Sequence, residues 1–93
     1  MTLPNNFYIF REFYIPQRMG ESVLNYIDRR VPTGSFLEAI ITNNLSEACA
    51  RADDENLKNL PAYIAYFYNE APGPCWGSTQ KMDAWLKGNA NGQ

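Results

Sequence analysis

Residues 53–70, DDENLKNLPAYIAYFYNE, join an acidic start to a run of apolar and aromatic residues. Acidic side chains are typical of a helix N-terminus, because the helix dipole is positive there. Large apolar side chains then recur at helical spacing, at Leu57, Leu60, Ile64, Phe67 and Tyr68. Pro61 forces either a kink or a restart, since it has no amide proton to donate. We predict one central core helix over about 55–70, kinked at Pro61.

Two helices are expected upstream of this segment. Pro16 stands at a natural first-turn position, and Pro32 ends a helix predicted over about 17–30. The apolar face of that helix is marked by Met19, Val23, Leu24, Ile27 and Val31. Ser35 and Glu38 then have the spacing of a capping box, which predicts a second helix starting at Ser35.

A third, short helix is expected between the second helix and the acidic segment. Asn43 and Asn44 break the pattern, because asparagine tolerates the left-handed geometry of a helix end, and Asn44 can cap the next helix. Small residues would give that helix a face for close packing, formed by Leu45, Ala48, Cys49 and Ala52.

The sequence allows two structures for the N-terminal segment but only one for the C-terminal segment. The aromatic and β-branched run of residues 7–15 predicts an extended segment or a short helix. Near the C-terminus, residues 71–74 form a rigid turn, Gly77 and Ser78 start a last helix, and Gly88 closes it.

These elements predict an all-α fold, a compact bundle of four to five short helices with a short extended N-terminal segment. Residues 1–93 form one domain, with an ordered core over about 7–87 and frayed ends. The predicted core consists of the large apolar side chains Phe36, Leu37, Ile40, Ile41, Leu57, Leu60, Ile64, Phe67, Trp76, Trp85 and Leu86.

Composition limits the classes of function. The net charge is -2, whereas a general nucleic-acid binder needs a concentrated basic face. No apolar stretch is long enough to span a bilayer, and the N-terminus lacks a secretory signal pattern, so we expect a cytoplasmic protein without membrane binding. Cys49 and Cys75 lack a metal-like spacing and are interpreted as reduced, buried thiols.

Catalysis is not expected. The chain has no histidine, which removes the usual general base and the commonest metal ligand. Phosphate-binding glycine motifs and paired-cysteine metal motifs are also missing. Asp53, Asp54 and Glu55 would suit a hard cation, but their position at a helix start favours capping. We expect a non-enzymatic protein without metal or cofactor.

Tyrosine and arginine side chains are the candidate binding residues. Six tyrosines exceed what a core of this size requires, and exposed tyrosine suits protein contacts or base stacking. Tyr63 and Tyr66 are expected at the flanks of the central helix, where they would meet a partner or rim their own core. Arginines are candidate partners for anions or acidic surfaces, namely Arg11, Arg18, Arg29 and Arg30.

Four segments resemble a family of small proteins of tailed phages and prophages: GSFLEAI (34–40), RADDEN (51–56), YFYNEAP (66–72) and CWGS (75–78). The likeness covers about residues 15–87 and implies a phage context without transferring any catalytic residue. By analogy, it implies an accessory protein that binds and neutralises a host defence component, as an anti-CRISPR-like protein inhibitor does. Two alternatives stay open. One is an oligomeric sponge for a cyclic or other immune signalling nucleotide, and the other is a regulatory or structural phage component.

Overall fold

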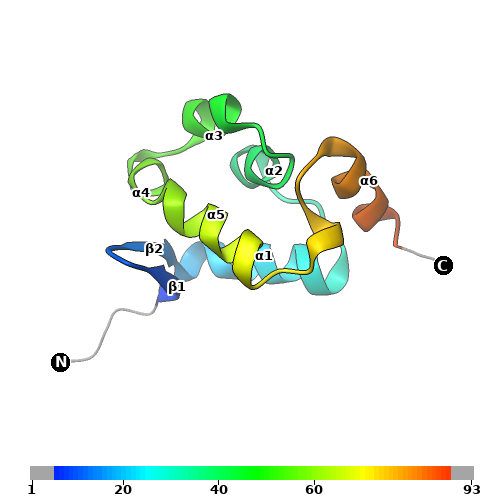
Figure 1. The fold of residues 1–93 in the computed structure, drawn as a ribbon, viewed down its shortest axis with the longest axis horizontal. Coiled ribbons are helices and arrows are strands. Elements are labelled where there is room, and N and C mark those ends of the chain that lie inside the picture. Colours follow the sequence, from blue (N-terminus) through cyan, green and yellow to red (C-terminus); the bar gives the residue numbers. More distant parts are fainter. Residues whose placement is uncertain (1–5, 89–93) are drawn as a thin grey trace.

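The computed structural model describes residues 6–88, so the prediction of frayed ends falls almost entirely outside the described residues. Within that range the chain forms a two-stranded hairpin, six α-helices and one 3₁₀ turn (Figure 1). In chain order these are β1 (Asn6–Phe10), β2 (Phe13–Pro16), α1 (Gln17–Arg29), α2 (Ser35–Ile41), α3 (Leu45–Arg51), α4 (Asp54–Lys58), α5 (Leu60–Asn69), η1 (Gly73–Cys75) and α6 (Thr79–Lys87).

The hairpin makes the all-α prediction only partly right. β1 and β2 are antiparallel, with Tyr8 opposite Ile15 and Phe10 opposite Phe13, and the register is irregular between Asn6 and Tyr8. Arg11 takes a positive φ of 57° in the connecting turn. The aromatic run therefore folds back on itself and pairs, where a single extended segment or a short helix was expected.

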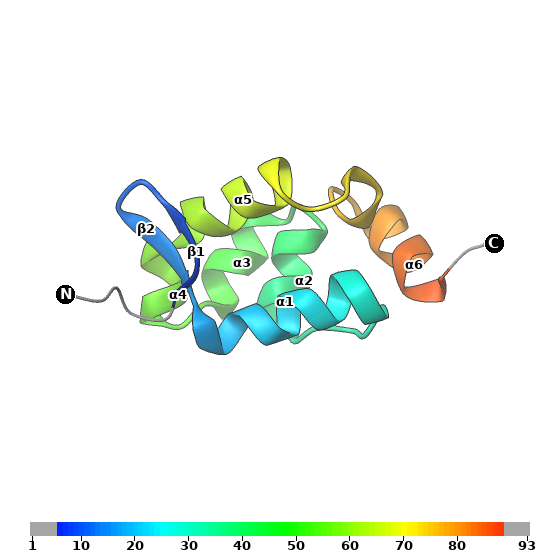
Figure 2. The ribbon, with the colours of Figure 1, turned by 90° about the horizontal axis from the view of Figure 1, so that it is seen from below.

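The two helices α1 and α5 form opposite sides of the molecule (Figure 2). Figure 2 shows α5 and α1 along opposite sides of the view, α2 and α3 between them, the hairpin at one end and α6 at the other. The hairpin packs closely on α1 at Gly20, where an added Cβ would lie 2.5 Å from a ring carbon of Phe7. Only glycine allows this approach without a shift of the strand.

The core is a cluster of buried side chains from the hairpin and the helices, and it matches the predicted core in part. Phe36, Leu37, Ile40, Ile41 and Phe67 are buried as predicted. Leu57 is 45% exposed, so its assignment to the core is wrong. The other predicted core side chains are half-buried, namely Leu60, Ile64, Trp76, Trp85 and Leu86. The side chains buried without having been assigned to the core include Ile15, Tyr26, Tyr63 and Met82.

Residues 53–70 form two helices, so the predicted kink at Pro61 is wrong and the chain restarts there. α4 ends at Lys58, Asn59 takes φ -110° and ψ 14°, and α5 starts at Leu60. Pro61 thus lies in the first turn of α5, where the missing amide costs no helical hydrogen bond. The restart also changes the helix phase. As a result Tyr68, predicted on the core side, is 78% exposed.

Most predicted helix ends are confirmed. Asn44 accepts a hydrogen bond from the Glu47 amide, and Ser78 accepts one from the Lys81 amide. Asn43 has a positive φ of 63°, as expected for the break before α3. The capping box at Ser35 is wrong, because Gly34 is the N-cap of α2 and no side chain caps that helix. Ser35 is the first residue of the helix and not its N-cap, so its hydroxyl is one position away from where a capping side chain must lie.

Helix α1 covers the predicted span but buries only part of its predicted apolar face. Val23 is buried, whereas Leu24 and Val31 are exposed. The helix ends at Arg29, and Arg30 follows in left-handed geometry with a φ of 61°. The chain thus leaves the helix two residues before Pro32.

Candidate binding surface

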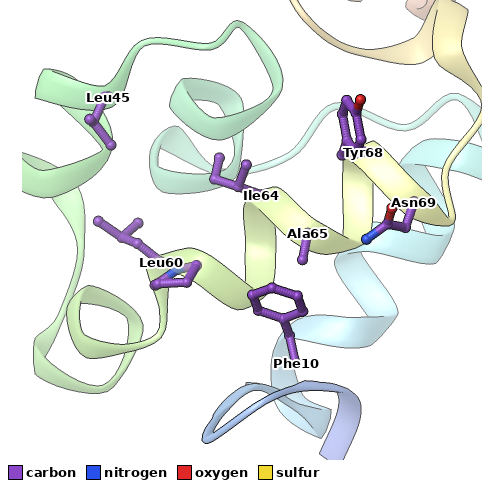
Figure 3. Close-up of a pocket in the computed structure, with 8 residues that line it drawn as sticks. Phe10, Leu45, Leu60, Ile64, Ala65, Tyr68 and Asn69 are labelled. Carbon is purple, nitrogen blue, oxygen red and sulfur yellow. The ribbon is translucent and has the colours of Figure 1, made fainter.

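An open apolar groove runs along α5, and we call it the α5 groove. It has a volume of about 480 Å³. Its lining residues come from the hairpin, α3 and α5, and they are Phe10, Leu45, Leu60, Pro61, Ile64, Ala65, Tyr68 and Asn69 (Figure 3). It brings together segments more than 50 residues apart in sequence, from Phe10 to Tyr68.

The floor of the α5 groove follows from helical spacing. Leu60, Ile64 and Tyr68 are four residues apart and therefore lie along one side of α5 over about 12 Å. Pro61 and Ala65 lie beside them and present little side-chain bulk. Leu45 is 61% exposed, so its side chain stands free at one wall.

A second hollow extends this apolar surface toward α2. It has a volume of about 230 Å³ and shares Leu45 and Ile64 with the α5 groove. The remaining lining residues are small, apolar or amide-bearing: Ala39, Ile40, Asn43, Asn44 and Ala48. The two hollows form one apolar strip that crosses from α2 and α3 to α5.

The lining of the α5 groove suits an apolar ligand. None of its lining side chains is charged, and Asn69 and the Tyr68 hydroxyl are its only side-chain polar groups. A charged ligand would lose hydration here without gaining a charged partner. An apolar protein face would instead be covered at little cost.

The predicted contact residue Tyr63 is buried, so its expected place at the flank of the helix is wrong. Its hydroxyl donates a 2.6 Å hydrogen bond to Oδ1 of Asn56. Burial raises the pKa of this tyrosine well above its ordinary value. Tyr63 therefore holds α5 against α4 from inside the protein.

Tyr66 is half-buried under the hairpin. Its ring centroid lies 5.1 Å from that of Phe7, 5.2 Å from that of Tyr8 and 5.6 Å from that of Phe67. Burial raises the pKa of Tyr66. The side chain rims its own core, and it does not line the α5 groove.

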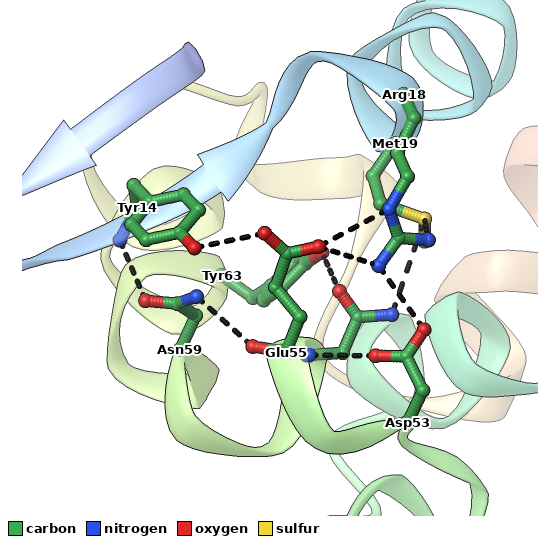
Figure 4. Close-up of polar contacts among 8 residues, drawn as sticks. Tyr14, Arg18, Met19, Asp53, Glu55, Asn59 and Tyr63 are labelled. Carbon is green, nitrogen blue, oxygen red and sulfur yellow. Dashed lines mark hydrogen bonds and ion pairs between the residues drawn. The ribbon is translucent and has the colours of Figure 1, made fainter. Parts of the chain in front are cut away.

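Arg18 belongs to a polar cluster that joins α1 to the start of α4 (Figure 4). Its Nη2 atom lies 3.0 Å from Oδ2 of Asp53 and 2.9 Å from Oε1 of Glu55. The Tyr14 hydroxyl donates a 2.8 Å hydrogen bond to the other oxygen of Glu55. This arginine is already paired with two carboxylates.

The carboxylates of this cluster titrate below their ordinary range. The hydrogen bond from Tyr14 and then that from Arg18 lower the pKa of Glu55. The pKa of Asp53 is lowered first by the hydrogen bond from the Asn56 amide, and Arg18 adds to the effect. Asp53 is the N-cap of α4, so the capping role predicted for this acidic segment is confirmed.

Arg30 attaches the last helix to α1. Its guanidinium carbon lies 3.6 Å from the centroid of the Trp85 ring, and its Nη1 donates a 3.2 Å hydrogen bond to the Trp85 carbonyl. The Trp85 indole donates in turn to the Tyr26 carbonyl at 3.0 Å. Arg30 is therefore engaged within the protein.

Arg11 and Arg29 lie in different parts of the fold, and Arg29 lines a surface hollow on α1 together with Arg18. Arg11 is in the hairpin turn, with its guanidinium carbon 5.1 Å from the centroid of the Phe10 ring. Phe10 lines the α5 groove, but Arg11 is not among its lining residues. Arg29 is exposed on α1. The six predicted residues thus form no common site, and the groove residues Phe10, Leu45, Leu60, Ile64 and Tyr68 had not been assigned to binding.

The two cysteines differ in exposure. Cys75 is buried as predicted, and burial raises the pKa of its thiol to about 11. Cys49 is exposed on α3, so the prediction that it is buried among alanines is wrong.

Among residues 6–88, no three potential metal-ligating side chains of His, Cys, Asp or Glu gather at one point. No helix in the same range has the length and apolar character needed to cross a membrane.

Comparisons with protein-family models, with curated proteins and with solved structures each returned no match to this chain.

Proposed function

We propose that this protein is a non-enzymatic phage or prophage accessory protein that uses the α5 groove to bind a protein of the host cytoplasm. In this proposal the groove takes the apolar face of an amphipathic helix from a host defence component, and binding neutralises that component. The single observation that carries the proposal is the uncharged apolar lining of the α5 groove. The phage context comes from the sequence resemblance of residues 15–87.

A helix is the occupant that fits this groove best. Apolar side chains of a helix recur every three or four residues and form a stripe, which matches the stripe of Leu60, Ile64 and Tyr68 on the floor. Ala65 and Pro61 leave room for the backbone of a second helix to come close. Tyr68 offers a large, exposed aromatic anchor of the kind that dominates binding energy at protein interfaces.

The nucleotide-sponge alternative gains less support. It requires tyrosine and arginine side chains around one pocket, with arginine available for phosphate. The α5 groove has Tyr68 but no arginine in its lining, and Arg18 and Arg30 are engaged with Glu55 and Trp85. The proposal therefore favours a protein partner.

Native mass spectrometry of the untagged protein, purified gently from its bacterial host, tests this proposal. The variant Leu45→Glu/Tyr68→Glu places two charges in the groove at exposed positions. The matched control is Leu24→Glu, which adds a charge at an exposed position of α1. We expect the wild type and the control to retain a host protein that the groove variant loses.

Three results would overturn the proposal. A host protein retained equally by the groove variant would move binding away from the α5 groove. An added mass of nucleotide size on an oligomer would support the sponge alternative instead. Retention of a phage protein in place of a host protein would support the regulatory or structural alternative.

A further inference from the structure

The two edges of the hairpin differ in their backbone hydrogen bonding. On β2, the Tyr14 amide donates a 2.9 Å hydrogen bond to Oδ1 of Asn59, which lies on the side away from β1. Tyr14 is paired with Ile9 in the register of the hairpin. Since the Tyr14 amide points outward, Ile9 and Tyr14 form a non-hydrogen-bonded pair, and the amide and carbonyl of Ile9 point away from β2.

Among the described residues, the outward-facing backbone groups of Ile9 on β1 have no hydrogen-bond partner. Within residues 6–88, no side chain and no backbone group outside the hairpin forms a hydrogen bond with Ile9. The Ile9 side chain is 48% exposed. Asn59 closes the edge of β2, whereas no described residue closes that of β1.

The sequence of β1 contains little that would keep another strand away. Exposed edges are usually protected by charged side chains, proline or bulges. The strand NFYIF has no charge and no proline, and its one protective feature is the irregular register between Asn6 and Tyr8. An extended polypeptide strand can pair with the free amide and carbonyl of Ile9 at the same time.

We propose that β1 pairs edge to edge with β1 of a second copy of this chain, antiparallel about a two-fold axis at Ile9. The same edge serves both copies, as an isologous dimer requires. Each Ile9 amide donates to the Ile9 carbonyl of the other copy, and the two hairpins form one four-stranded sheet.

Side-chain chemistry favours this self-pairing. With Ile9 opposite Ile9, two β-branched side chains meet, which is a favourable cross-strand pair. Arg11 of each copy then lies toward Phe7 of the other copy, so the two arginines stay apart. The uncharged strand places no like charges opposite each other. This inference is independent of the proposed function, since Ile9 does not line the α5 groove.

Sedimentation equilibrium over a range of protein concentrations tests the inference. We expect a monomer–dimer equilibrium in the wild type. Ile9→Lys places two like charges opposite each other and should raise the dissociation constant at least about tenfold. Ile9→Pro removes the bridging amide, which the hairpin itself does not use. Leu24→Lys is the control, because it adds the same charge on exposed α1 and should leave the equilibrium unchanged.

Hydrogen exchange of the Ile9 amide gives a second readout that needs no variant. Its protection should rise with protein concentration if this amide bridges two copies. A monomer at all concentrations would overturn the inference. So would a dimer that Leu45→Lys dissociates and the two Ile9 variants do not, since that result would assign the contact to the α5 groove.

Discussion

The hydroxyl of Tyr63 on α5 and Oδ1 of Asn56 on α4 form a 2.6 Å hydrogen bond between two buried side chains. The bond spans the restart at Asn59 and holds the two short helices together. Tyr63→Phe should destabilise the fold by about 1–3 kcal/mol, because the Asn56 oxygen would stay buried without a donor. Urea denaturation measures this loss. Tyr68→Phe, at an exposed position, should change stability by less than about 0.5 kcal/mol.

A second prediction separates the true core from the sequence-based one. Phe67 is buried against Tyr66 and Trp76, so Phe67→Ala should cost about 3–5 kcal/mol. Leu57 is 45% exposed, and Leu57→Ala should cost less than about 1 kcal/mol. Chemical denaturation of both variants checks the pair. Equal losses would mean that α4 presents a different face to the core.

Arg30 offers a test that distinguishes side-chain contacts from backbone geometry. Arg30→Ala removes the contact with Trp85 and should cost about 1–2 kcal/mol, with faster hydrogen exchange in α6. Arg30→Gly removes the same contact but relaxes the positive φ of 61°. We therefore expect Arg30→Gly to be more stable than Arg30→Ala by about 1 kcal/mol. The opposite order would contradict the left-handed geometry of this residue.

The polar cluster around Glu55 predicts a loss of stability in acid. The pKa values of Asp53 and Glu55 are lowered from 3.8 and 4.5, so the folded state favours the ionised carboxylates. Their contribution is complete above those ordinary values and is lost as the pH falls through the lower folded values. The free energy of unfolding should therefore drop as the pH falls below about 4.5.

Glu55→Gln provides the control for that pH dependence. The difference in unfolding free energy between wild type and Glu55→Gln should be largest near neutral pH and shrink below about pH 4.5. The unfolding free energy of Glu21→Gln, a variant at an exposed position of α1, should change with pH as that of the wild type does. If the difference in unfolding free energy between the wild type and Glu55→Gln does not change with pH, the proposed role of the Glu55 charge is contradicted.

Helix ends were the most predictable part of the fold because they depend on local chemistry. Asn44, Asp53 and Ser78 cap their helices through their own side chains. Such bonds join residues two or three apart in sequence, so a short stretch of sequence is enough to predict them. Ser35 fails by one position, because Gly34 supplies the extended backbone of the N-cap.

The hairpin and the helix phase depended on contacts between distant segments. The positive φ in the hairpin turn is adopted by Arg11, whereas such turns are usually recognised in a sequence by glycine or asparagine. Strand β2 is held by a hydrogen bond to Asn59, which is 45 residues away from Tyr14 in sequence. The restart at Asn59 shifted the buried face of α5 toward Tyr63 and exposed Tyr68. A continuous helical pattern over residues 53–70 could not show that shift.

The candidate site was missed for the same reason. The α5 groove combines half-buried Phe10, Leu60 and Ile64 with exposed Leu45 and Tyr68, which come from three elements. On the helices, apolar side chains at helical spacing were interpreted as core or packing residues from the sequence alone. Two of the predicted contact residues instead make contacts within the protein: Tyr63 bonds to Asn56, and Arg30 stacks on Trp85.

Site-specific photo-crosslinking in the bacterial host tests the central claim most directly. A photo-reactive phenylalanine analogue replaces Tyr68 in the α5 groove, and the same analogue replaces Leu24 on α1 as the control. The account predicts that position 68 crosslinks to one segment of a host protein with apolar residues three or four apart, and that position 24 does not. Equal crosslinking at both positions, or crosslinking at position 68 only to a second copy of this chain, would contradict it.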